Sequence, residues 1–216
     1  MRTAALASLV LAVLCAGGAS AGVIRGTLVL GGGAKTGRPD PGLAEAVIFI
    51  EAVPEKVERK LSGGQGWWPF FHHAQKPQHA PRIVQAGMRF KPRVLATTKG
   101  QAVEFVNLDN VYHNAFSVSA AKSFDLGKYA PGKRDTVMFD RTGVVNLHCD
   151  IHPQEVGYVV IVPNHAMTRP DSLGRYALPK LPEGHYTVRA WTSRRGEIHR
   201  DVEVPRRGDV TLDLRY

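Results

Sequence analysis

The sequence predicts an all-β sandwich protein, and three observations lead to that fold class. Short runs rich in β-branched and aromatic residues follow one another along most of the chain. Clusters of Gly, Pro, Asn and Asp separate these runs, as is typical of turns between strands. No segment carries a long helical repeat of apolar residues. With 216 residues and 44% hydrophobic content, the chain can form one large β domain or two small ones.

The start of the chain, residues 1–21, is typical of a secretory signal peptide. A charged start, a short apolar run and small residues ending at Ala21 follow in order. Cys15 would suit a lipoprotein, but Leu14 just before it is too large for that processing site. The apolar run is too short to span a membrane, and no other segment is apolar enough. We therefore expect a periplasmic or secreted protein without a membrane span.

The β-rich runs can be placed in order along the rest of the chain. The expected strands lie within residues 23–30, 46–52, 82–94, 102–106, 136–139, 144–148, 158–162, 174–178, 186–191, 199–204 and 210–214. One segment, residues 61–81, has no strand period and is rich in Gly, Pro, His and aromatic residues, which predicts a long loop. Its aromatic side chains could contact a partner or pack over the edge of a core, and its histidines could bind metal transiently. These residues are Trp67, Trp68, Phe70, Phe71, His72, His73 and His79.

The formal net charge of +9 leaves several partner classes open. The basic residues are scattered, and neither a Lys/Arg tract nor a nucleic-acid-binding motif is present, so we do not expect nucleic acid as a partner. A basic surface could help docking to an acidic protein partner, or it could serve solubility alone.

The cysteine count points to a special role for Cys149. After cleavage behind Ala21 it would be the only cysteine left, so an internal disulfide is excluded. A lone thiol in an oxidising compartment is either buried or bound to a metal. His152 follows three residues later, and His113 lies just beyond the expected strand 102–106. Copper in electron-transfer sites takes two imidazole nitrogens and one thiolate in a roughly trigonal plane, although the same ligand types also suit zinc.

Four runs of sequence occur in an order that resembles the plastocyanin-like cupredoxins, including proteins related to methylamine utilisation. They are residues 103–117 (VEFVNLDNVYHNAFS), 123–127 (SFDLG), 143–153 (GVVNLHCDIHP) and 157–162 (GYVVIV). The resemblance covers residues 82–163. It implies a Greek-key β-sandwich that holds one mononuclear copper ion, with His113, Cys149 and His152 as the equatorial ligands. No residue indicates a link to amine oxidation.

The chain departs from that family at Glu155. In the members with the shortest ligand loop, an axial methionine follows the cysteine by six residues, and here that position is Glu155. The site would then have an axial carboxylate, no axial side chain, or one from Gln154, Met88 or Met167. We hypothesise that Glu155 favours Cu(II), lowers the reduction potential and shifts the colour away from simple blue. The alternative is that Glu155 points to solvent.

Other polar residues near the expected site receive lesser roles. His148 should face away from the metal because neighbours on a strand point to opposite sides. Asn107 and Asn114 could steady the ligand loops through hydrogen bonds. We expect His165, His185 and His199 to be ordinary surface residues, since their spacing is not that of ligands.

The two flanking segments resemble the halves of a carboxypeptidase-regulatory-like β-sandwich. Residues 171–191 resemble its second half, and residues 26–52 fit its first half. Neither half has enough strands to close a core alone. We therefore predict that residues 22–60 and 164–216 form one small sandwich, split by a cupredoxin domain at 82–163. One continuous, enlarged sandwich is the alternative.

Three functions compete at this stage. An electron carrier that works with a redox partner is the first prediction, and no enzymatic activity is expected. Copper binding for storage, tolerance or delivery to a partner is the alternative. The intact set of His and Cys residues argues against the third possibility, a scaffold with a vestigial site.

Overall fold

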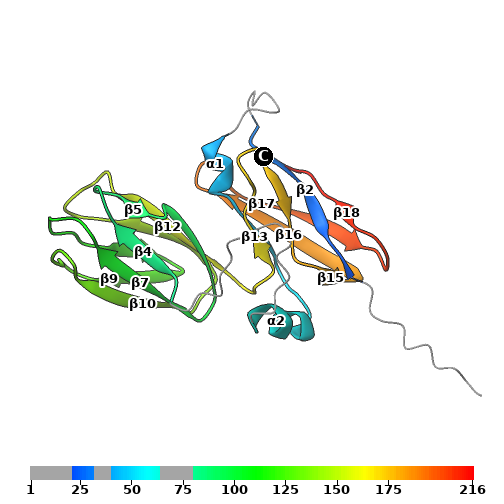
Figure 1. Ribbon diagram of the computed structural model, residues 1–216, viewed down its shortest axis with the longest axis horizontal. Coiled ribbons are helices and arrows are strands. Elements are labelled where there is room, and N and C mark those ends of the chain that lie inside the picture. The colour runs from blue at the N-terminus through cyan, green and yellow to red at the C-terminus, as the bar shows by residue number, and fades with distance from the viewer. Residues whose placement is uncertain (1–20, 32–39, 64–79) are drawn as a thin grey trace, which may run out of the picture.

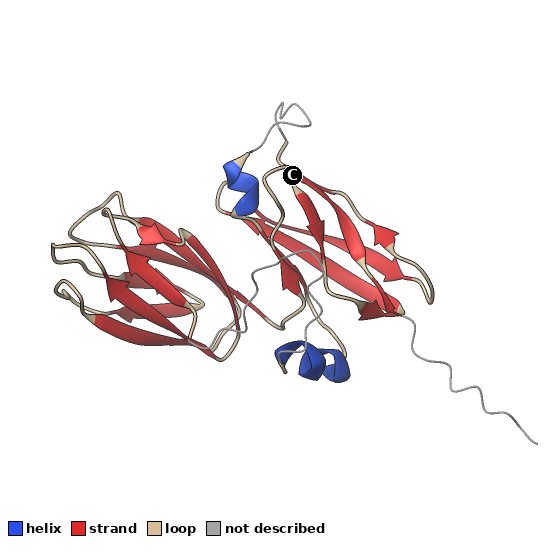
Figure 2. Cartoon of the chain, viewed as in Figure 1, coloured by secondary structure: helices blue, strands red, loops and turns tan. Residues whose placement is uncertain are grey.

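The computed structural model describes residues 21–31, 40–63 and 80–216 (Figure 1). The described chain is built of strands, with two short helices, α1 (Pro41–Ala44) and α2 (Glu55–Ser62) (Figure 2). The strands form two β-sandwiches that lie side by side (Figure 1). The all-β fold class predicted from the sequence is therefore confirmed. The predicted signal peptide, apart from Ala21, and the aromatic and histidine residues of the 61–81 segment lie outside the described residues.

The inserted sandwich, as we call residues 82–162, consists of two sheets. The first sheet has the strand order β10 (Arg134–Phe139), β7 (Gln101–Asn107), β4 (Arg82–Gln85) and β5 (Phe90–Lys91). The second has the order β6 (Val94–Thr98), β12 (Val156–Val162), β11 (Gly143–His148), β8 (Phe116–Ser119) and β9 (Lys122–Asp125). Inward-facing side chains from both sheets make one core. They include Ile83, Val103, Phe105, Phe139, Val145, Leu147, Val159 and Ile161.

The run predicted as one β segment over residues 82–94 is divided in the structure. A tight turn separates β4 from β5, with Ala86 N donating to Arg89 O, and β6 starts at Val94. Gly87 and Met88 both have positive φ, 65° and 53°. Two successive positive φ values are typical of the hairpin turns that match the strand twist. This β4–β5 hairpin lies next to the candidate site described below.

The outer sandwich, as we call the second one, is assembled from both ends of the described chain. One sheet has the order β13 (Met167–Thr168), β3 (Val47–Ile50), β16 (Gly184–Thr192) and β17 (Gly196–Val204). In the other, β2 (Ile24–Val29) pairs with β14 (Arg175–Ala177), β18 (Val210–Thr211) and β19 (Leu214–Arg215), and a separate pair joins β1 (Ala21–Gly22) to β15 (Leu181–Pro182). The early strands β2 and β3 thus pair with strands that follow the inserted sandwich, and the chain does not form one continuous sandwich.

Helix α2 was not predicted from the sequence. It extends from the end of the predicted first part into the predicted loop, and none of its residues is buried. Its two apolar residues, Val57 and Leu61, pack partly buried against the core of the outer sandwich, but two positions are too few to be recognised as a helical repeat. Its charges fit a helix, because Glu55 and Glu58 lie in the first turn and Arg59 and Lys60 in the last.

The two sandwiches share an apolar junction. Its buried side chains come from both sandwiches: Val47, Phe49 and Trp191 from the outer one, and Val94, Val160 and Val162 from the inserted one. Arg169 crosses the same junction. Its guanidinium donates to Val94 O at 2.7 Å and to the carbonyls of Ala44 and Glu45 at 3.4 and 3.3 Å. One side chain therefore satisfies backbone acceptors of both sandwiches.

Replacing Arg169 should weaken the fold measurably. In Arg169→Leu the carbonyls of Val94, Ala44 and Glu45 lose their donor, so we expect the free energy of unfolding to fall by about 2 kcal/mol. Urea denaturation would measure the change, with Arg141→Leu, an exposed arginine in the turn before β11, as the matched control. Equal stability of the two variants would show that Arg169 does not secure the junction.

Candidate metal centre

The four predicted ligand residues converge at one end of the inserted sandwich. His113 lies in the connection between β7 and β8, where its backbone forms an isolated bridge with Tyr129. Cys149 follows β11 directly, and His152 and Glu155 lie on the loop that leads to β12. Each of the four offers one ligand atom, and these atoms all lie within 4.8 Å of one another. The two distant segments are brought together because β8 and β12 both pair with β11.

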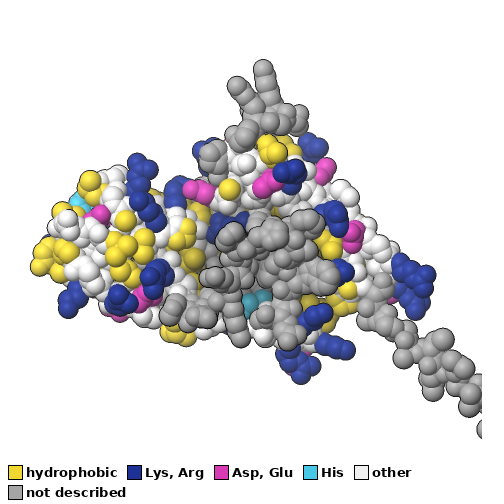
Figure 3. Space-filling view, viewed as in Figure 1, with side chains coloured by type: hydrophobic (Ala, Val, Ile, Leu, Met, Phe, Trp, Pro, Cys, Tyr) yellow, Lys and Arg dark blue, Asp and Glu magenta, His cyan; other side chains and the backbone are white. Residues whose placement is uncertain are grey.

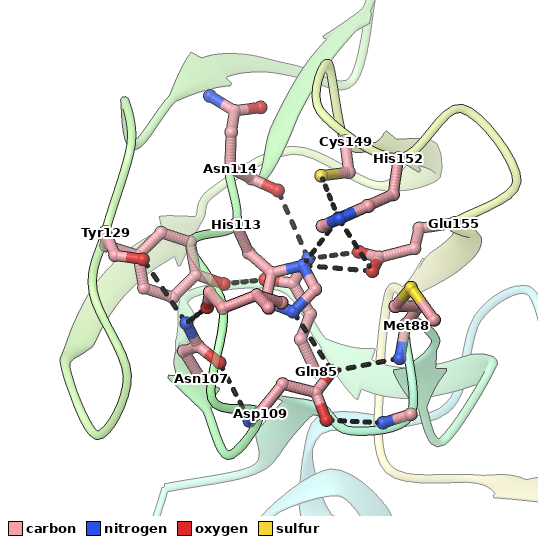
Figure 4. A network of polar contacts seen from close by, with 12 residues as sticks. Gln85, Met88, Asn107, Asp109, His113, Asn114, Tyr129, Cys149, His152 and Glu155 are labelled. Carbon is pink, nitrogen blue, oxygen red and sulfur yellow. Dashed lines mark hydrogen bonds and ion pairs between the residues drawn. The ribbon is translucent and has the colours of Figure 1, made fainter.

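The distances between these side chains are short (Figure 4). His113 Nδ1 lies 3.1 Å from His152 Nδ1 and 2.9 Å from Glu155 Oε1. His152 Nδ1 lies 3.8 Å from Cys149 Sγ and 3.4 Å from Glu155 Oε1. Two ring nitrogens, a thiol sulfur and a carboxylate oxygen thus surround one small space.

Most of this group is buried. The side chains of His113 and Glu155 are fully buried, and that of His152 is 18% exposed. The alternative in which Glu155 points to solvent is therefore wrong. Gln154 is exposed and lines a pocket elsewhere, and Met167 packs in the junction between the sandwiches. Met88, the third alternative for the axial position, lies beside the group (Figure 4).

The protonation pattern around His113 fits a bound cation. Its Nε2 lies 3.0 Å from Asp109 Oδ2, and an ionised carboxylate only accepts hydrogen bonds, so we assign the ring proton to Nε2. A neutral imidazole then has a lone pair on Nδ1, which lies 2.9 Å from Glu155 Oε1. Glu155 Oε1 is buried and accepts no hydrogen bond. A metal ion would satisfy both lone pairs, and two imidazoles, a thiolate and a carboxylate suit copper and also zinc.

Asp109 is a site residue that the sequence analysis missed. Its carboxylate accepts hydrogen bonds from the backbone N–H groups of Gly87 and Met88, at 2.6 and 2.9 Å, while it also holds His113. Burial alone would raise the pKa of Asp109, but these backbone bonds and the His113 ring outweigh it and hold the pKa below its usual value. The spacing of four residues before His113 was the signal that could have found it. A carboxylate behind a ligand histidine fixes the ring and raises its basicity.

Gln85 orients the carboxylate of Glu155 from the opposite side. The Gln85 side chain is buried, and its Nε2 donates to Glu155 Oε2 and to Asn114 O. Its Oε1 accepts from the hydroxyl of Tyr129. Burial, followed by the negative charges of Glu155 and Cys149, raises the pKa of Tyr129, which keeps this hydroxyl protonated as a donor. With Oε2 bound to Gln85, Oε1 is the carboxylate oxygen that faces the histidines.

The two asparagines steady the ligand loops, as predicted. Asn107 donates to the carbonyls of Val111 and Tyr129, at 2.8 and 3.3 Å, and accepts from Asp109 N at 2.9 Å. Asn114 donates to Asp125 Oδ1 at 2.7 Å.

The other histidines of the described residues lie outside the group. His148 packs against Phe116, with ring centroids 5.7 Å apart and the ring planes tilted by 39°. His165 is not an ordinary surface residue: it is half-buried, with Nδ1 2.5 Å from Glu58 Oε1 on α2. Sequence spacing could not reveal this pairing, because Glu58 lies 107 residues away.

Known proteins offer only partial likenesses. The chain matches no family model and no curated protein. Among solved structures, a copper-containing nitrite reductase from Thermus scotoductus SA-01 is similar over 38% of this chain and 22% of its own, with 28% identity and a TM-score of 0.37. A purple cupredoxin from Nitrosopumilus maritimus is similar over 38% of this chain and 98% of its own, with 26% identity and a TM-score of 0.34. A mutant of amicyanin in its Cu(I) form is similar over 38% of this chain and 81% of its own, with 22% identity and a TM-score of 0.36.

Neither of the helices in the described residues has the length and apolar character needed to cross a membrane.

Removing the carboxylate behind His113 should weaken metal binding. Asp109→Asn keeps the size of the side chain but loses its charge, so we expect the affinity for Cu(II) to fall by about 10- to 100-fold. Competition with a chelator of known affinity would measure this. Asp150→Asn, an exposed carboxylate next to Cys149, is the matched control and should bind as the wild type does. A smaller loss in Asp109→Asn than in the control would contradict the role of Asp109.

Replacing Gln85 should destabilise the metal-free protein. Gln85→Leu leaves the Tyr129 hydroxyl and Glu155 Oε2 without their buried partner, so the free energy of unfolding should fall by about 1–3 kcal/mol. Gln101→Leu, at an exposed position of β7, serves as the control in the same urea titration. An unchanged unfolding midpoint for Gln85→Leu would count against this network.

Proposed function

We propose that this chain is a cupredoxin-type protein that binds one copper ion through His113, Cys149, His152 and Glu155 and transfers electrons. One observation carries the proposal. His113 Nδ1 and Glu155 Oε1, which accepts no hydrogen bond, lie in contact inside the protein, beside His152 and Cys149. The ordered motifs of residues 82–163 favour copper over zinc, because they resemble the plastocyanin-like cupredoxins. Copper would supply a one-electron redox couple at this position.

The donor set favours a carrier over an enzyme. Catalytic metal sites keep a coordination position open for substrate or water. Here four protein donors surround one small space, so a bound ion would have its coordination filled by the chain itself. The surrounding hydrogen bonds from Asp109 and Gln85 fix His113 and Glu155, which limits ligand movement between oxidation states. We therefore propose electron transfer without catalysis.

Glu155 would tune the copper. A hard carboxylate oxygen stabilises Cu(II) relative to Cu(I), so we propose a lower reduction potential than a methionine in this position would give. Its buried position, with Oε2 held by Gln85, supports a ligand role and makes an incidental contact a poor explanation.

A protein partner would approach at the end of the sandwich that carries the ligands. The ring of His152 is partly exposed there. Large apolar side chains near His113 are also exposed: Leu108 at 61%, Val111 at 45% and Tyr112 at 59%. Apolar surface next to a partly exposed ligand suits a short-lived redox complex. The signal-peptide pattern of residues 1–21 supports an exchange in the periplasm or outside the cell.

The outer sandwich would serve packing or docking. Its sequence resembles carboxypeptidase-regulatory-like modules in residues 26–52 and 171–191, and such modules usually have no chemistry of their own. Its share of the apolar junction, which includes Trp191, holds the inserted sandwich in place.

Copper storage or delivery is the second candidate function. The partly exposed His152 ring and the hard oxygen of Glu155 favour it, because both would ease release of Cu(I). A carrier should keep its copper through repeated reduction and oxidation in the presence of a Cu(I) chelator, whereas a delivery protein should lose it.

The absorption and electron paramagnetic resonance spectra of the Cu(II)-loaded protein would test the site. We expect an intense thiolate-to-copper band that disappears in Cys149→Ser and shifts in Glu155→Gln, since the carboxylate then leaves the copper. Glu203→Gln, an exposed carboxylate on β17, is the control and should leave the band unchanged. Weak copper signals without an intense band would refute the cupredoxin proposal.

A further inference from the structure

A second pocket lies at the junction of the two sandwiches, away from the four ligand side chains. It has a volume of about 510 Å³. Glu45, just after α1, lines it from the outer sandwich, and the inserted sandwich supplies the other walls: Arg89, Phe90, Lys91, Arg93, Gln154 and Val156. Figure 1 shows β5 and α1 on either side of this junction. Junctions between domains are common places for small-molecule sites, and this volume is within their usual range.

The charges in the pocket are not balanced. Arg93 is neutralised, because its guanidinium lies 2.5 Å from Glu45 Oε2, donates to Ser193 and stacks over Tyr158. Arg89 and Lys91 are exposed, and among the described residues neither side chain forms an ion pair or hydrogen bond. In Figure 3, Lys and Arg side chains gather along this edge of the inserted sandwich and at the junction. The pocket therefore presents two uncompensated positive charges.

The same pocket borders the loop that carries Glu155. Gln154 and Val156 line the pocket while Glu155 between them turns inward to the histidines. Phe90 packs directly on the end of this loop: a Cβ on Gly157 would lie only 3.0 Å from Phe90 Cβ. A shift of β5 would therefore displace the loop that carries Glu155.

The β4–β5 hairpin also reaches the candidate metal centre through hydrogen bonds. Gln85, at the end of β4, donates to Glu155 Oε2, and the backbone N–H groups of Gly87 and Met88 in the turn donate to Asp109, which holds His113. Arg89 and Lys91 follow within the same hairpin. One short element thus carries the unpaired cations of the pocket and the supports of two ligand residues.

We propose that this pocket binds a small dianion, a dicarboxylate or a phosphate, through Arg89 and Lys91, with the Gln154 amide as a further donor. The β4–β5 hairpin couples its occupancy to the metal centre. The binding site stands on the pocket and its charges alone, and only the coupling rests on the copper function proposed above.

Calorimetric titration of the metal-free protein with succinate, and separately with inorganic phosphate, tests the binding site. At least one of the two anions should bind saturably. Binding of succinate would identify a dicarboxylate site, and binding of phosphate would identify a phosphate site. The double variant Arg89→Gln/Lys91→Gln should lose at least about tenfold in affinity, because charge-assisted hydrogen bonds disappear. Glu45→Gln should bind more tightly than the wild type, since it frees Arg93 and removes a negative charge from the pocket.

Matched controls separate a built site from general attraction to a basic protein. Arg206→Gln/Arg207→Gln removes two exposed charges from the loop between β17 and β18, and should keep the wild-type affinity. The proposal is overturned if neither anion binds with a Kd below about 1 mM, or if this control loses as much affinity as the pocket variant. Weaker binding by Glu45→Gln would overturn the charge argument.

The coupling has its own readout. In the Cu(II)-loaded protein, a saturating anion should shift the thiolate-to-copper band, and it should not do so in Arg89→Gln/Lys91→Gln. Binding without any shift would refute the coupling and leave the anion site intact. If no such band exists at all, the copper function fails, and the titration of the metal-free protein still decides the anion site.

Discussion

The hydrogen bond between His113 Nε2 and Asp109 fixes the orientation of the His113 ring, on which the geometry of the candidate metal centre depends. It leaves Nδ1 with a lone pair, inside the protein, 2.9 Å from a carboxylate oxygen that no donor satisfies. Without a cation, this contact would place two electron-rich atoms together in a buried space, which is costly. The surrounding network holds the contact in place: Gly87 and Met88 fix Asp109, and Gln85 fixes the other carboxylate oxygen. The arrangement is therefore suited to a bound cation.

The two sandwiches divide the work of the chain. The inserted sandwich carries all four candidate ligands, and the outer sandwich contributes the junction and one wall of the second pocket. Arg169 and the apolar cluster around Trp191 make the junction a packed interface, with no sign of a loose tether between the described parts. A group bound at the junction would therefore contact both sandwiches at once.

The sequence predicted the fold class, and it singled out the four side chains that the structure brings together, since both have local signals. Alternating apolar runs mark strands, and the close spacing of Cys149 and His152 marks a metal site. What it could not predict depends on contacts between distant residues. The inward position of Glu155 depends on Gln85, 70 residues away, and the pairing of His165 depends on Glu58, on a helix with only two apolar residues. Asp109 could have been found, because it lies only four residues before His113, within a run already singled out.

The inserted sandwich interrupts the sequence of the outer one, and this affects the order in which the two can fold. Strands β2 and β3 are made first, but their partners β14, β16, β18 and β19 come only after the entire inserted sandwich. The inserted sandwich, by contrast, pairs only strands from its own continuous segment. Pairing across so long a separation is slow, because the chain must close a long loop first. The inserted sandwich can therefore fold before the outer sandwich is complete. Until the last fifty or so residues of the chain are made, β2 and β3 have unpaired edges.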